Sequence, residues 1–343
     1  MVKMTKSKKA SRKDVAQLAG VSLTTVTHAL NDTPDTRLRS ETIKRVQAAA
    51  DELNYRPNFV GRALITGKTF TVGLLQPSYK SLFSNFYQRI IYGIVESMDQ
   101  DDYNLVTMFR SPQQKYLKSI QQGRVDGMLI LQSEIASRDI DAIIATGIPT
   151  VIVNRYYPVA EKLTVGNVRS DHKLLIQNVM KQFVELGCKS VLAFHDYLNC
   201  DPNRQLNNAF IDIVNNELNN TILGSTIIPS RDNLHNQIHN LFNNGQKWDG
   251  ILVDGFTTAD LVLNEAKKVG LKHKKDFQLI VEDCYKKENS YSMDEATSYV
   301  QSPVEVGATA WQLMHKLINE EPTQRERLIP YRQVKQNSSK QTE

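Results

Sequence analysis

Apolar residues near the start of the chain recur with the spacing of a short helix. Leu18 and Ala19 follow Val15 at the third and fourth positions, so one face of this segment is apolar. Ser11 precedes them as a candidate N-cap, because its hydroxyl can accept hydrogen bonds from the free N–H groups of the first turn. Gly20 follows as a residue that takes a positive φ at a helix end without strain. The pattern therefore predicts a helix between Ser11 and Gly20.

A second helical segment, residues 23–30, begins directly after Ser22, which stands where an N-cap belongs. Val26, Ala29 and Leu30 form its predicted inward face. Short polar or methyl-bearing side chains remain at its N-terminal end and on its outer face: Leu23, Thr24, Thr25, Thr27 and His28. In a helix-turn-helix such residues of the second helix approach base edges in the major groove. The alternative is an ordinary corner between two helices of a larger helical domain.

A third helix is predicted over residues 41–53, with Ser40 as its N-cap and apolar residues along one side. Three helices would make a compact N-terminal domain. Asn58 then stands where it can cap a further short helix over residues 59–65, which Gly67 ends. This last segment is the predicted linker to the rest of the chain.

From residue 70 onward, short apolar runs alternate with amphipathic segments, which is typical of parallel sheets with crossover helices. The predicted strands are residues 71–77, 103–109, 126–132, 149–154, 190–196, 224–230, 249–255 and 276–283. The predicted helices are residues 86–98, segments ending at Gly123 and Gly147, residues 174–186 and 205–218, a segment near Asn240, and residues 259–270 and 304–319. The fold class is therefore α/β, with two similar lobes behind a small helical domain.

The charge of the chain is concentrated at its N-terminus. The whole chain of 343 residues has a net charge of +5, but residues 1–68 hold 13 Lys/Arg against 6 Asp/Glu, whereas residues 69–343 hold 29 against 31. A basic N-terminal part on a nearly neutral remainder fits one small module that meets a polyanion and a separate module with another task. No apolar run is long enough to span a membrane, and the basic N-terminus lacks the apolar region of a secretory signal.

The sequence carries no pattern that indicates an enzyme, a cofactor or a metal site. Cys188, Cys200 and Cys284 lie far apart without a C-x-x-C pair, which predicts thiols in a reducing cytoplasm instead of disulfides or zinc ligands. The chain has no G-x-S-x-G, no Walker loop and no zincin motif. An enzyme on an α/β body with an accessory DNA-binding domain is therefore the weaker alternative.

Three stretches resemble a known family in their residues and in their spacing: KDVAQLAGVSLTTVTHALN, RVQAAADELNYRPNFVGRAL and TVGLLQP. They are similar to the start of the lactose/galactose-repressor (LacI/GalR) family of transcription regulators, and the resemblance extends more thinly over the remaining chain. It implies a helix-turn-helix DNA-binding domain over residues 1–57, a hinge helix and linker over 58–68, a two-lobed effector-binding and dimerisation domain over 69–330, and a tail over 331–343. The body would resemble periplasmic sugar-binding proteins, with a ligand cleft between its lobes.

The resemblance also implies roles for residues of the DNA-binding part. The base-reading positions of the family fall on Leu23, Thr24 and His28, although many members have arginine in place of the histidine. The positions that contact backbone phosphates fall on Ser11, Ser22, Thr25, Thr27, Asn31, Tyr55 and Asn58. The leucine that the family inserts into a minor-groove step corresponds to Leu64. Gly61 replaces the usual hinge alanine, which costs about 0.5–1 kcal/mol of helix stability.

The resemblance places an effector site in the cleft, with several departures from the family pattern. The matching residues are Phe86 and Tyr87, Asp171, Asp283 and Gln301. The arginine position of the family falls on Leu206, with Arg204 nearby as a substitute, and its Asn-Asp pair has become Gly255-Phe256. Phe256 would stack on a sugar ring or close the site. Asp171 and Asp283 have helix or turn capping as their alternative roles.

The implied protein is a repressor that binds a double-stranded, palindromic operator as a homodimer. Its effector would be a small molecule of the carbohydrate class. Because cleft residues are altered, the alternative is a regulator that acts without an effector or with a protein corepressor. Because a palindrome needs two DNA-binding domains, a homodimer is expected, and family members pair through the helices beginning near Phe86 and Gln205. Neither a membrane nor a cofactor is expected to be involved.

Overall fold

The computed structural model describes residues 10–30, 38–56, 59–76, 83–131, 135–158, 163–195, 201–218, 222–227, 234–243, 247–283 and 296–334. The chain divides into two compact units, Met1–Thr69 and Phe70–Glu343. We call them the head and the body. In the part of the chain that is described, no helix combines the length and the apolar composition needed to cross a membrane.

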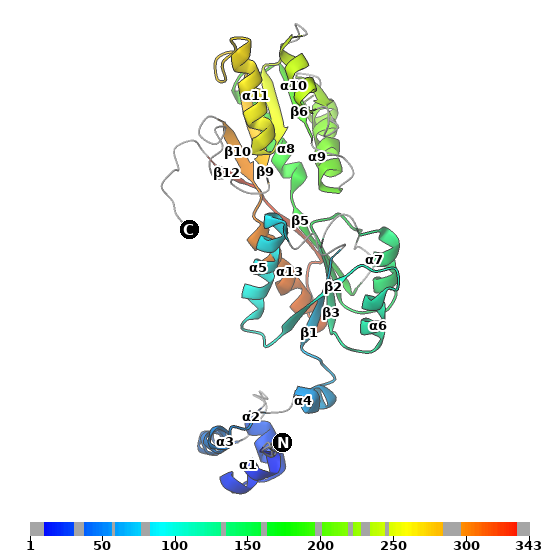
Figure 1. Cartoon of the computed structure of the whole chain (residues 1–343), viewed down its shortest axis with the longest axis vertical. Coiled ribbons are helices and arrows are strands. Elements are labelled where there is room, and N and C mark those ends of the chain that lie inside the picture. The colour runs from blue at the N-terminus through cyan, green and yellow to red at the C-terminus, as the bar shows by residue number, and fades with distance from the viewer. Residues whose placement is uncertain are drawn as a thin grey trace, which may run out of the picture. The chain divides into compact units, whose positions relative to one another are not determined.

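The described residues of the head form the helices α1 (Arg12–Ala19), α2 (Leu23–Leu30), α3 (Ser40–Glu52) and α4 (Phe59–Thr66) (Figure 1). Helices α1 to α3 enclose a small core of valine and alanine side chains: Val15, Ala16, Ala19, Val26, Ala29, Val46, Ala49 and Ala50. Small side chains let three short helices approach closely enough to exclude water. The predicted three-helix domain is thus present.

Two details of the head differ from the sequence-based prediction. Leu18 is 47% exposed, while Ala16 is buried in its place, because the core lies against the arc of α1 that runs from Val15 past Ala19 to Ala16. Ser40 is the first residue of α3, and Arg39, with an extended backbone, occupies the N-cap position without a side-chain hydrogen bond. The prediction that Ser40 caps this helix was wrong.

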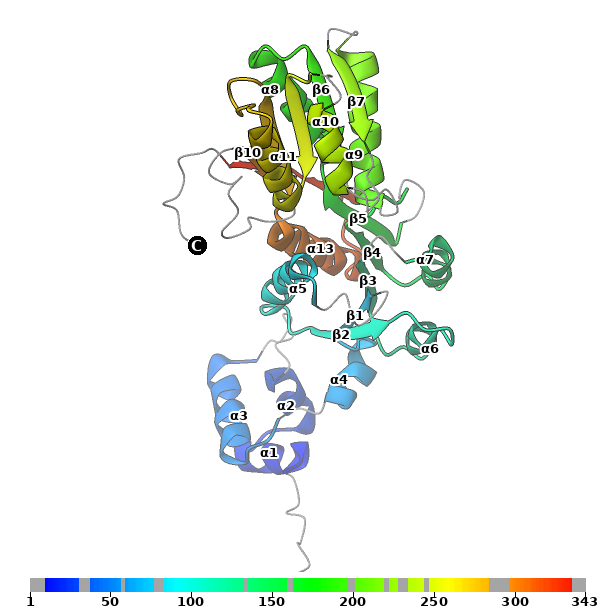
Figure 2. The same cartoon turned by 45° about the horizontal axis from the view of Figure 1, so that its top comes forward.

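The first lobe of the body is a parallel sheet covered by helices on both faces (Figure 2). Its strand order is β11-β5-β4-β3-β1-β2. The strands are β1 (Thr71–Gln76), β2 (Asn104–Phe109), β3 (Gly127–Leu131), β4 (Thr150–Val153), β5 (Val165–Ser170) and β11 (Glu326–Ile329). The helices are α5 (Asn85–Met98), α6 (Lys115–Gln121), α7 (Ser137–Ile144) and α13 (Pro303–Ile318).

The second lobe repeats this plan, with the strand order β12-β10-β9-β8-β6-β7 and only β12 antiparallel to its neighbour. Its strands are β6 (Ser190–Phe194), β7 (Leu223–Ile227), β8 (Gly250–Asp254), β9 (Gln278–Asp283), β10 (Thr297–Val300) and β12 (Arg332–Val334). Its helices are α8 (His172–Glu185), α9 (Asp201–Asp212), the π-helical turn η2 (Ile213–Glu217), α10 (Leu234–Asn243) and α11 (Phe256–Lys268). The predicted two-lobed α/β fold with parallel sheets is confirmed.

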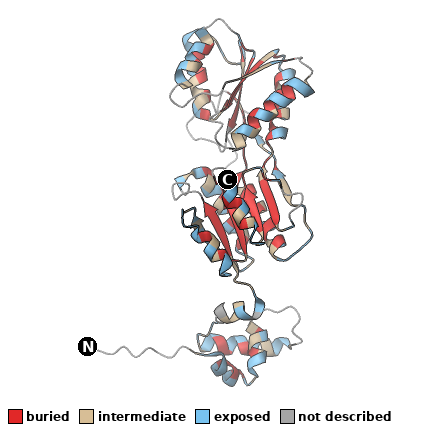
Figure 3. Ribbon diagram, turned by 90° about the vertical axis from the view of Figure 1, so that its right-hand side faces the viewer, coloured by how far each residue is buried: buried red, intermediate tan, exposed pale blue. Residues whose placement is uncertain are grey.

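Central strands are buried on both faces (Figure 3). In β1, Leu74 belongs to the core under α5 and α13, whereas Leu75 belongs to the core under α6 and α7. This explains why these strands appear in the sequence as unbroken apolar runs. Alternate residues of β1 serve two different cores, which favours apolar side chains on both faces of the strand.

Three segments cross between the lobes, and the strands beside them were absent from the sequence-based prediction. These strands are β5, β10, β11 and β12. The chain crosses from β5 to α8, from β10 to α13 and from β11 to β12. β12 also places residues 332–334 in the second sheet, so the predicted tail boundary after residue 330 is corrected. These strands are short or interrupted by polar residues, which hides them in a search for apolar runs.

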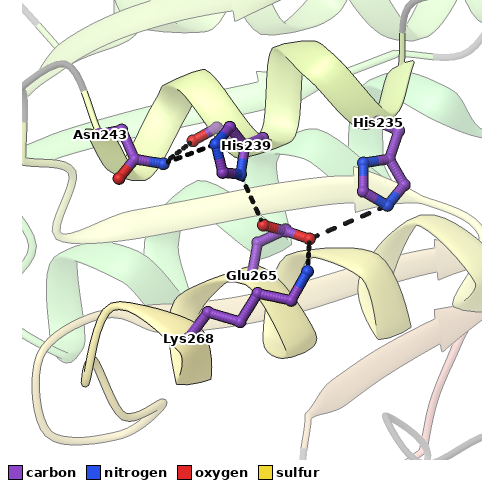
Figure 4. A network of polar contacts seen from close by, with 5 residues as sticks. All are labelled: His235, His239, Asn243, Glu265 and Lys268. Atoms are coloured by element: carbon purple, nitrogen blue, oxygen red, sulfur yellow. Dashed lines mark hydrogen bonds and ion pairs between the residues drawn. The ribbon is translucent and has the colours of Figure 1, made fainter.

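A buried carboxylate joins two helices at the surface of the second lobe (Figure 4). Lys268 Nζ donates to Glu265 Oε1 at 2.6 Å, and His239 Nδ1 lies 2.9 Å from Oε2. His235 Nε2, one turn before His239 on α10, lies 3.8 Å from Oε1. The hydrogen bonds from Lys268 and His239 lower the pKa of Glu265 to about 2. The charged form of Glu265 therefore connects α10 to α11.

Replacing Glu265 by glutamine is expected to flatten the acid side of the stability profile. The folded-state pKa of about 2 lies below the ordinary value of 4.5. The contribution of this carboxylate is therefore fully present above pH 4.5 and is lost as the pH falls towards 2. Urea unfolding of E265Q between pH 6 and pH 3 should show lower stability than the parent at the upper end and a smaller difference at the lower end.

Glu185→Gln provides the control, because Glu185 lies at the surface 4.0 Å from Lys181 in an ordinary helical ion pair. That variant should leave the pH profile almost unchanged, since exposed pairs contribute little. Parallel profiles for E265Q and the parent would show that Glu265 does not carry the acid dependence.

Candidate functional site

The first candidate site is the outer surface of α2, which local hydrogen bonds hold in place. Ser11 caps α1 in a reciprocal capping box with Asp14, and Gly20 ends that helix with φ 62°. Ser22 Oγ then accepts from the backbone N–H of Thr25 at 3.1 Å, so it caps α2 as predicted. Two caps and one left-handed residue therefore set the angle between α1 and α2.

The side chains that project from α2 are those that the sequence pattern placed outside. Leu23 is 44% exposed, and Thr24 and His28 are exposed, whereas Val26 and Ala29 are buried in the head core. An exposed leucine side chain in the first turn of a short helix obtains no stabilisation from its contact with water. This surface therefore offers one apolar and two polar groups to a partner.

The remaining hydroxyls of α2 are partly engaged within the head. Thr27 Oγ1 donates to the carbonyl oxygen of Leu23 at 3.0 Å and accepts from Arg12 Nη1 at 2.8 Å. The hydroxyls of Ser22 and Thr25 lie 2.9 Å apart. Predicted phosphate contacts from Thr25 and Thr27 would have to share or replace these hydrogen bonds.

The other residues predicted for this surface lie on separate parts of the head. Tyr55 is half-buried and packs against the head core. Gly61 is half-buried in α4, and Leu64, on the same helix, is 82% exposed. Asn31 and Asn58 lie outside the described residues.

The second candidate site lies in the body, where the chain crosses between the lobes. Ser170 Oγ, at the carboxyl end of β5, donates to Gln301 Oε1 at 2.8 Å. Gln301 Nε2 donates to Glu282 Oε1 of β9 at 3.4 Å. All three side chains are buried. They connect the carboxyl end of a first-lobe strand to the second sheet through one of the crossing segments.

Buried polar atoms without a described hydrogen-bond partner also occur just after the carboxyl ends of strands. They include Asn154 Oδ1 after β4 and His195 Nε2 after β6. Asn207 Oδ1, within α9, is also buried without a described hydrogen-bond partner. Burial lowers the pKa of His195 to about 4, so this imidazole is neutral at pH 7. Such atoms are costly to bury unpaired, so they call for a ligand or water.

The predicted aromatic effector residues are mainly packed inside the lobes. Phe86 belongs to the core under α5 and α13, and the half-buried Tyr87 meets its ring edge-on at 5.4 Å between centroids. Phe256 is 1% exposed and belongs to the core between the second sheet, α10 and α11. The expectation that Phe256 faces the cleft is therefore corrected, because its ring fills an apolar core under the first turn of α11.

The predicted polar effector residues are placed less uniformly. Asp171 caps α8, where its Oδ1 accepts from Leu174 N at 3.0 Å, as in its alternative structural role. Arg204 is exposed on α9, while Leu206 is buried in the second-lobe core. Asp283 ends β9, but its side chain lies outside the described residues.

Arg169 is a residue between the lobes that the sequence did not reveal. Its Nη1 donates to Gln205 Oε1 of the second lobe, and its Nη2 donates to Glu326 Oε1 of the first, both at 3.0 Å. Its guanidinium also lies over the Tyr156 ring, 5.3 Å from the centroid. Arg169 lies in β5, a strand that the sequence pattern did not predict, and for that reason its position between the lobes was not indicated by the sequence. Among the described residues, no group of three His, Cys, Asp or Glu residues could hold a metal ion.

The N-terminal sequence and the fold of the chain both resemble those of known proteins. The sequence profile described as "Bacterial regulatory proteins, lacI family" matches residues 12–58, which include α1, α2 and α3. Over these residues, the chain resembles the lacI family. The chain is 32% identical over 188 residues to the HTH-type transcriptional regulator RegA of Clostridium saccharobutylicum, and the match covers 52% of this chain and 55% of that protein.

Further matches include regulators and a solved repressor structure. The HTH-type transcriptional repressor PurR of Photobacterium profundum is 36% identical over 151 residues, covering 42% of this chain and 43% of that protein. The chain therefore spans about half the length of the curated relatives that it matches.

The crystal structure of the lac repressor dimer bound to operator and the anti-inducer ONPF has a TM-score of 0.70, with 21% identity, and the alignment covers 96% of this chain and 98% of that chain. The names of these matched proteins describe transcription regulators or repressors.

Proposed function

We propose that the chain is a transcription repressor that binds a palindromic operator in double-stranded DNA as a homodimer. The observation that carries this proposal is the surface of α2. Two caps hold this short helix against α1 and its inner face is buried, yet Leu23, Thr24 and His28 project outwards. Methyl and polar groups at the start of an exposed second helix suit base edges in the major groove.

The proposed base readers differ in chemistry. Leu23 offers an apolar surface for a thymine methyl group, Thr24 offers a hydroxyl, and His28 offers a ring nitrogen for guanine. Seven of the Lys and Arg charges of residues 1–68 are not balanced by acids, since the segment has 13 basic against 6 acidic residues. This charge supports binding to phosphates, while the surface of α2 supplies selectivity.

A homodimer is part of the proposal because a palindrome needs two heads. Exposed apolar side chains on the two helices expected to pair support it. On α5, Tyr92 is 57% exposed and Val95 is 50% exposed, and on α9, Ile211 is 42% exposed. Burial of such groups in a second copy of the chain would remove apolar surface from water.

The body is proposed to bind a small polar effector of the carbohydrate class. Its support is the set of buried, unpaired atoms on Asn154, His195 and Asn207, which can exchange hydrogen bonds with ligand hydroxyls. The crossing residues Ser170 and Gln301 connect the two lobes beside these strand ends. An effector that binds one arrangement of the lobes better than another would change the operator affinity of the dimer.

The test selects a palindrome from random DNA and measures the affinity of the purified protein at fixed salt. We expect His28→Ala to lower affinity for the selected sequence by roughly tenfold while it changes affinity for random DNA little. Lys44→Ala, an exposed change on α3 that removes charge, is the matched control and should act equally on both DNAs. Absence of any sequence preference would contradict the proposed function.

The same assay tests the effector. A pool of sugars and sugar phosphates should shift operator affinity of the parent, and Asn207→Ala should reduce that shift without changing the affinity measured in the absence of the pool. Specific DNA binding that no sugar alters would contradict a carbohydrate effector and favour a regulator without an effector or with a protein corepressor.

A further inference from the structure

A hydrogen bond between α1 and α2 places an arginine beside the outer surface of α2, which is the proposed base-reading surface. Arg12 Nη1 donates to Thr27 Oγ1 at 2.8 Å, across 15 positions of the sequence. The same hydroxyl donates to the carbonyl oxygen of Leu23 at 3.0 Å. Thr27 therefore uses its oxygen as acceptor for the guanidinium and its proton to anchor itself on α2. The result is a fixed support for the Arg12 side chain.

The guanidinium is available for a partner outside the protein. Arg12 is exposed, and it forms no ion pair with a carboxylate in the described part of the chain. Arginine has five N–H donors in a planar fork, of which Thr27 receives one hydrogen bond. Thr27 lies one turn after Leu23 and directly before His28, so the fork is held next to side chains proposed to read bases.

The composition of α2 shows what this surface lacks. Its eight residues are LTTVTHAL, which include no Arg, Lys, Asn, Gln, Asp or Glu. Those are the side chains that recognise guanine, adenine or cytosine by paired or strongly directed hydrogen bonds in the major groove. α2 alone therefore offers methyl, hydroxyl and imidazole contacts. Any bidentate reader would therefore have to come from another element.

We propose that Arg12 is that reader, and that it recognises a guanine in each half-site through its O6 and N7 atoms. This inference rests on the DNA-binding function proposed above. Arg12 contributes the two parallel donors that guanine requires, and Thr27 limits the rotation of the guanidinium so that less side-chain freedom is lost on binding. The recognition surface thus includes the first residue of α1 as well as α2.

The experiment uses the full-length protein and the palindrome that it selects from random DNA. Affinity is measured for the parent, Arg12→Lys and Thr27→Val on that sequence and on a set in which each base pair of the half-site is changed in turn. Arg12→Lys preserves the positive charge but removes the fork. We expect it to reduce discrimination at one G·C pair of each half-site by roughly tenfold, with little change in the salt dependence.

Thr27→Val preserves the shape of the side chain but removes the hydroxyl, and it should weaken discrimination at the same base pair by a smaller factor. Lys44→Ala is the control for charge and should lower affinity equally for all sequences. Circular dichroism confirms that each variant is folded.

The outcomes separate this inference from the proposed function. Unchanged discrimination in Arg12→Lys, or an equal loss at all base pairs, would overturn the role of Arg12 as a reader while specific binding by the parent stands. A parent protein without sequence preference would overturn both proposals. Loss of preference at one pair in Arg12→Lys, with the weaker loss in Thr27→Val, would support both.

Discussion

Alanine in place of Gly93 is expected to destabilise the first lobe by about 1–3 kcal/mol. Gly93 lies where α5 crosses α13, and an added Cβ would overlap the carbonyl oxygen of Val304 and lie 2.9 Å from its carbonyl carbon. The reverse contact repeats this arrangement, because a Cβ on Gly307 would overlap the carbonyl oxygen of Ile90. Each helix therefore approaches the backbone of the other at a glycine.

The sign of this effect follows from two opposing contributions. Alanine favours a helix by about 1 kcal/mol relative to glycine. The clash is with backbone atoms, which cannot rotate away as a side chain can, so the two helices must separate and their shared core must loosen. This second contribution is the larger, and the net change for Gly93→Ala is a loss of stability.

Urea unfolding followed by circular dichroism and by tryptophan fluorescence measures this loss. Trp311 is buried in the core under α5 and α13, so its emission should report the loosened lobe. Gln312→Ala changes an exposed position on α13 and should leave the midpoint nearly unchanged. An equal midpoint for G93A and the parent would show that the crossing is less close than the structure indicates.

Replacing Leu64 by alanine is expected to lower operator affinity by roughly tenfold or more and to reduce DNA bending. Leu64 is 82% exposed on α4, so its apolar side chain is not buried against the described residues of the head. An apolar wedge between two base pairs costs unstacking energy but bends the duplex so that more protein contacts it. Without the wedge, the bend and its added contacts should be lost together.

Gly61→Ala gives a comparison of the opposite sign on the same helix. Alanine should stabilise α4 by about 0.5–1 kcal/mol, which would raise operator affinity a few-fold if an ordered α4 is needed for binding. The operator affinity and the bend angle should therefore decrease in L64A and increase in G61A. The bend angle is measured by energy transfer between dyes at the two ends of the operator. Unchanged bending and affinity in L64A would contradict the wedge.

The main outline of the protein was predictable because it depends on neighbouring residues. The caps by Ser11 and Ser22 and the turn at Gly20 involve contacts within a few positions, and the structure has all three. The buried strands are also recognisable from short stretches of sequence, because β3 and β4 are buried on both faces and are therefore mostly apolar. Periodicity and capping chemistry therefore reveal the helix-turn-helix and the alternating body.

The candidate sites were less predictable, because burial depends on distant segments. Phe256 and Leu206 stand where a family pattern places cleft residues, but each is enclosed by its own lobe. Arg169 was hidden because β5 is flanked by β11, whose Glu326 comes 157 residues later. The role proposed for Arg12 depends on its hydrogen bond to Thr27, 15 positions later in the chain.

The sequence by itself determined which segments are helices, which strands are buried on both sides and where the basic N-terminal part begins, because spacing and charge are properties of the chain. Tertiary structure alone decided which side of a lobe each side chain faces, and which polar atoms remain unpaired at the strand ends. It also decided that Gly93 and Gly307 meet partner backbones across one helix crossing. These features depend on distances between residues remote in the chain, and folding sets those distances.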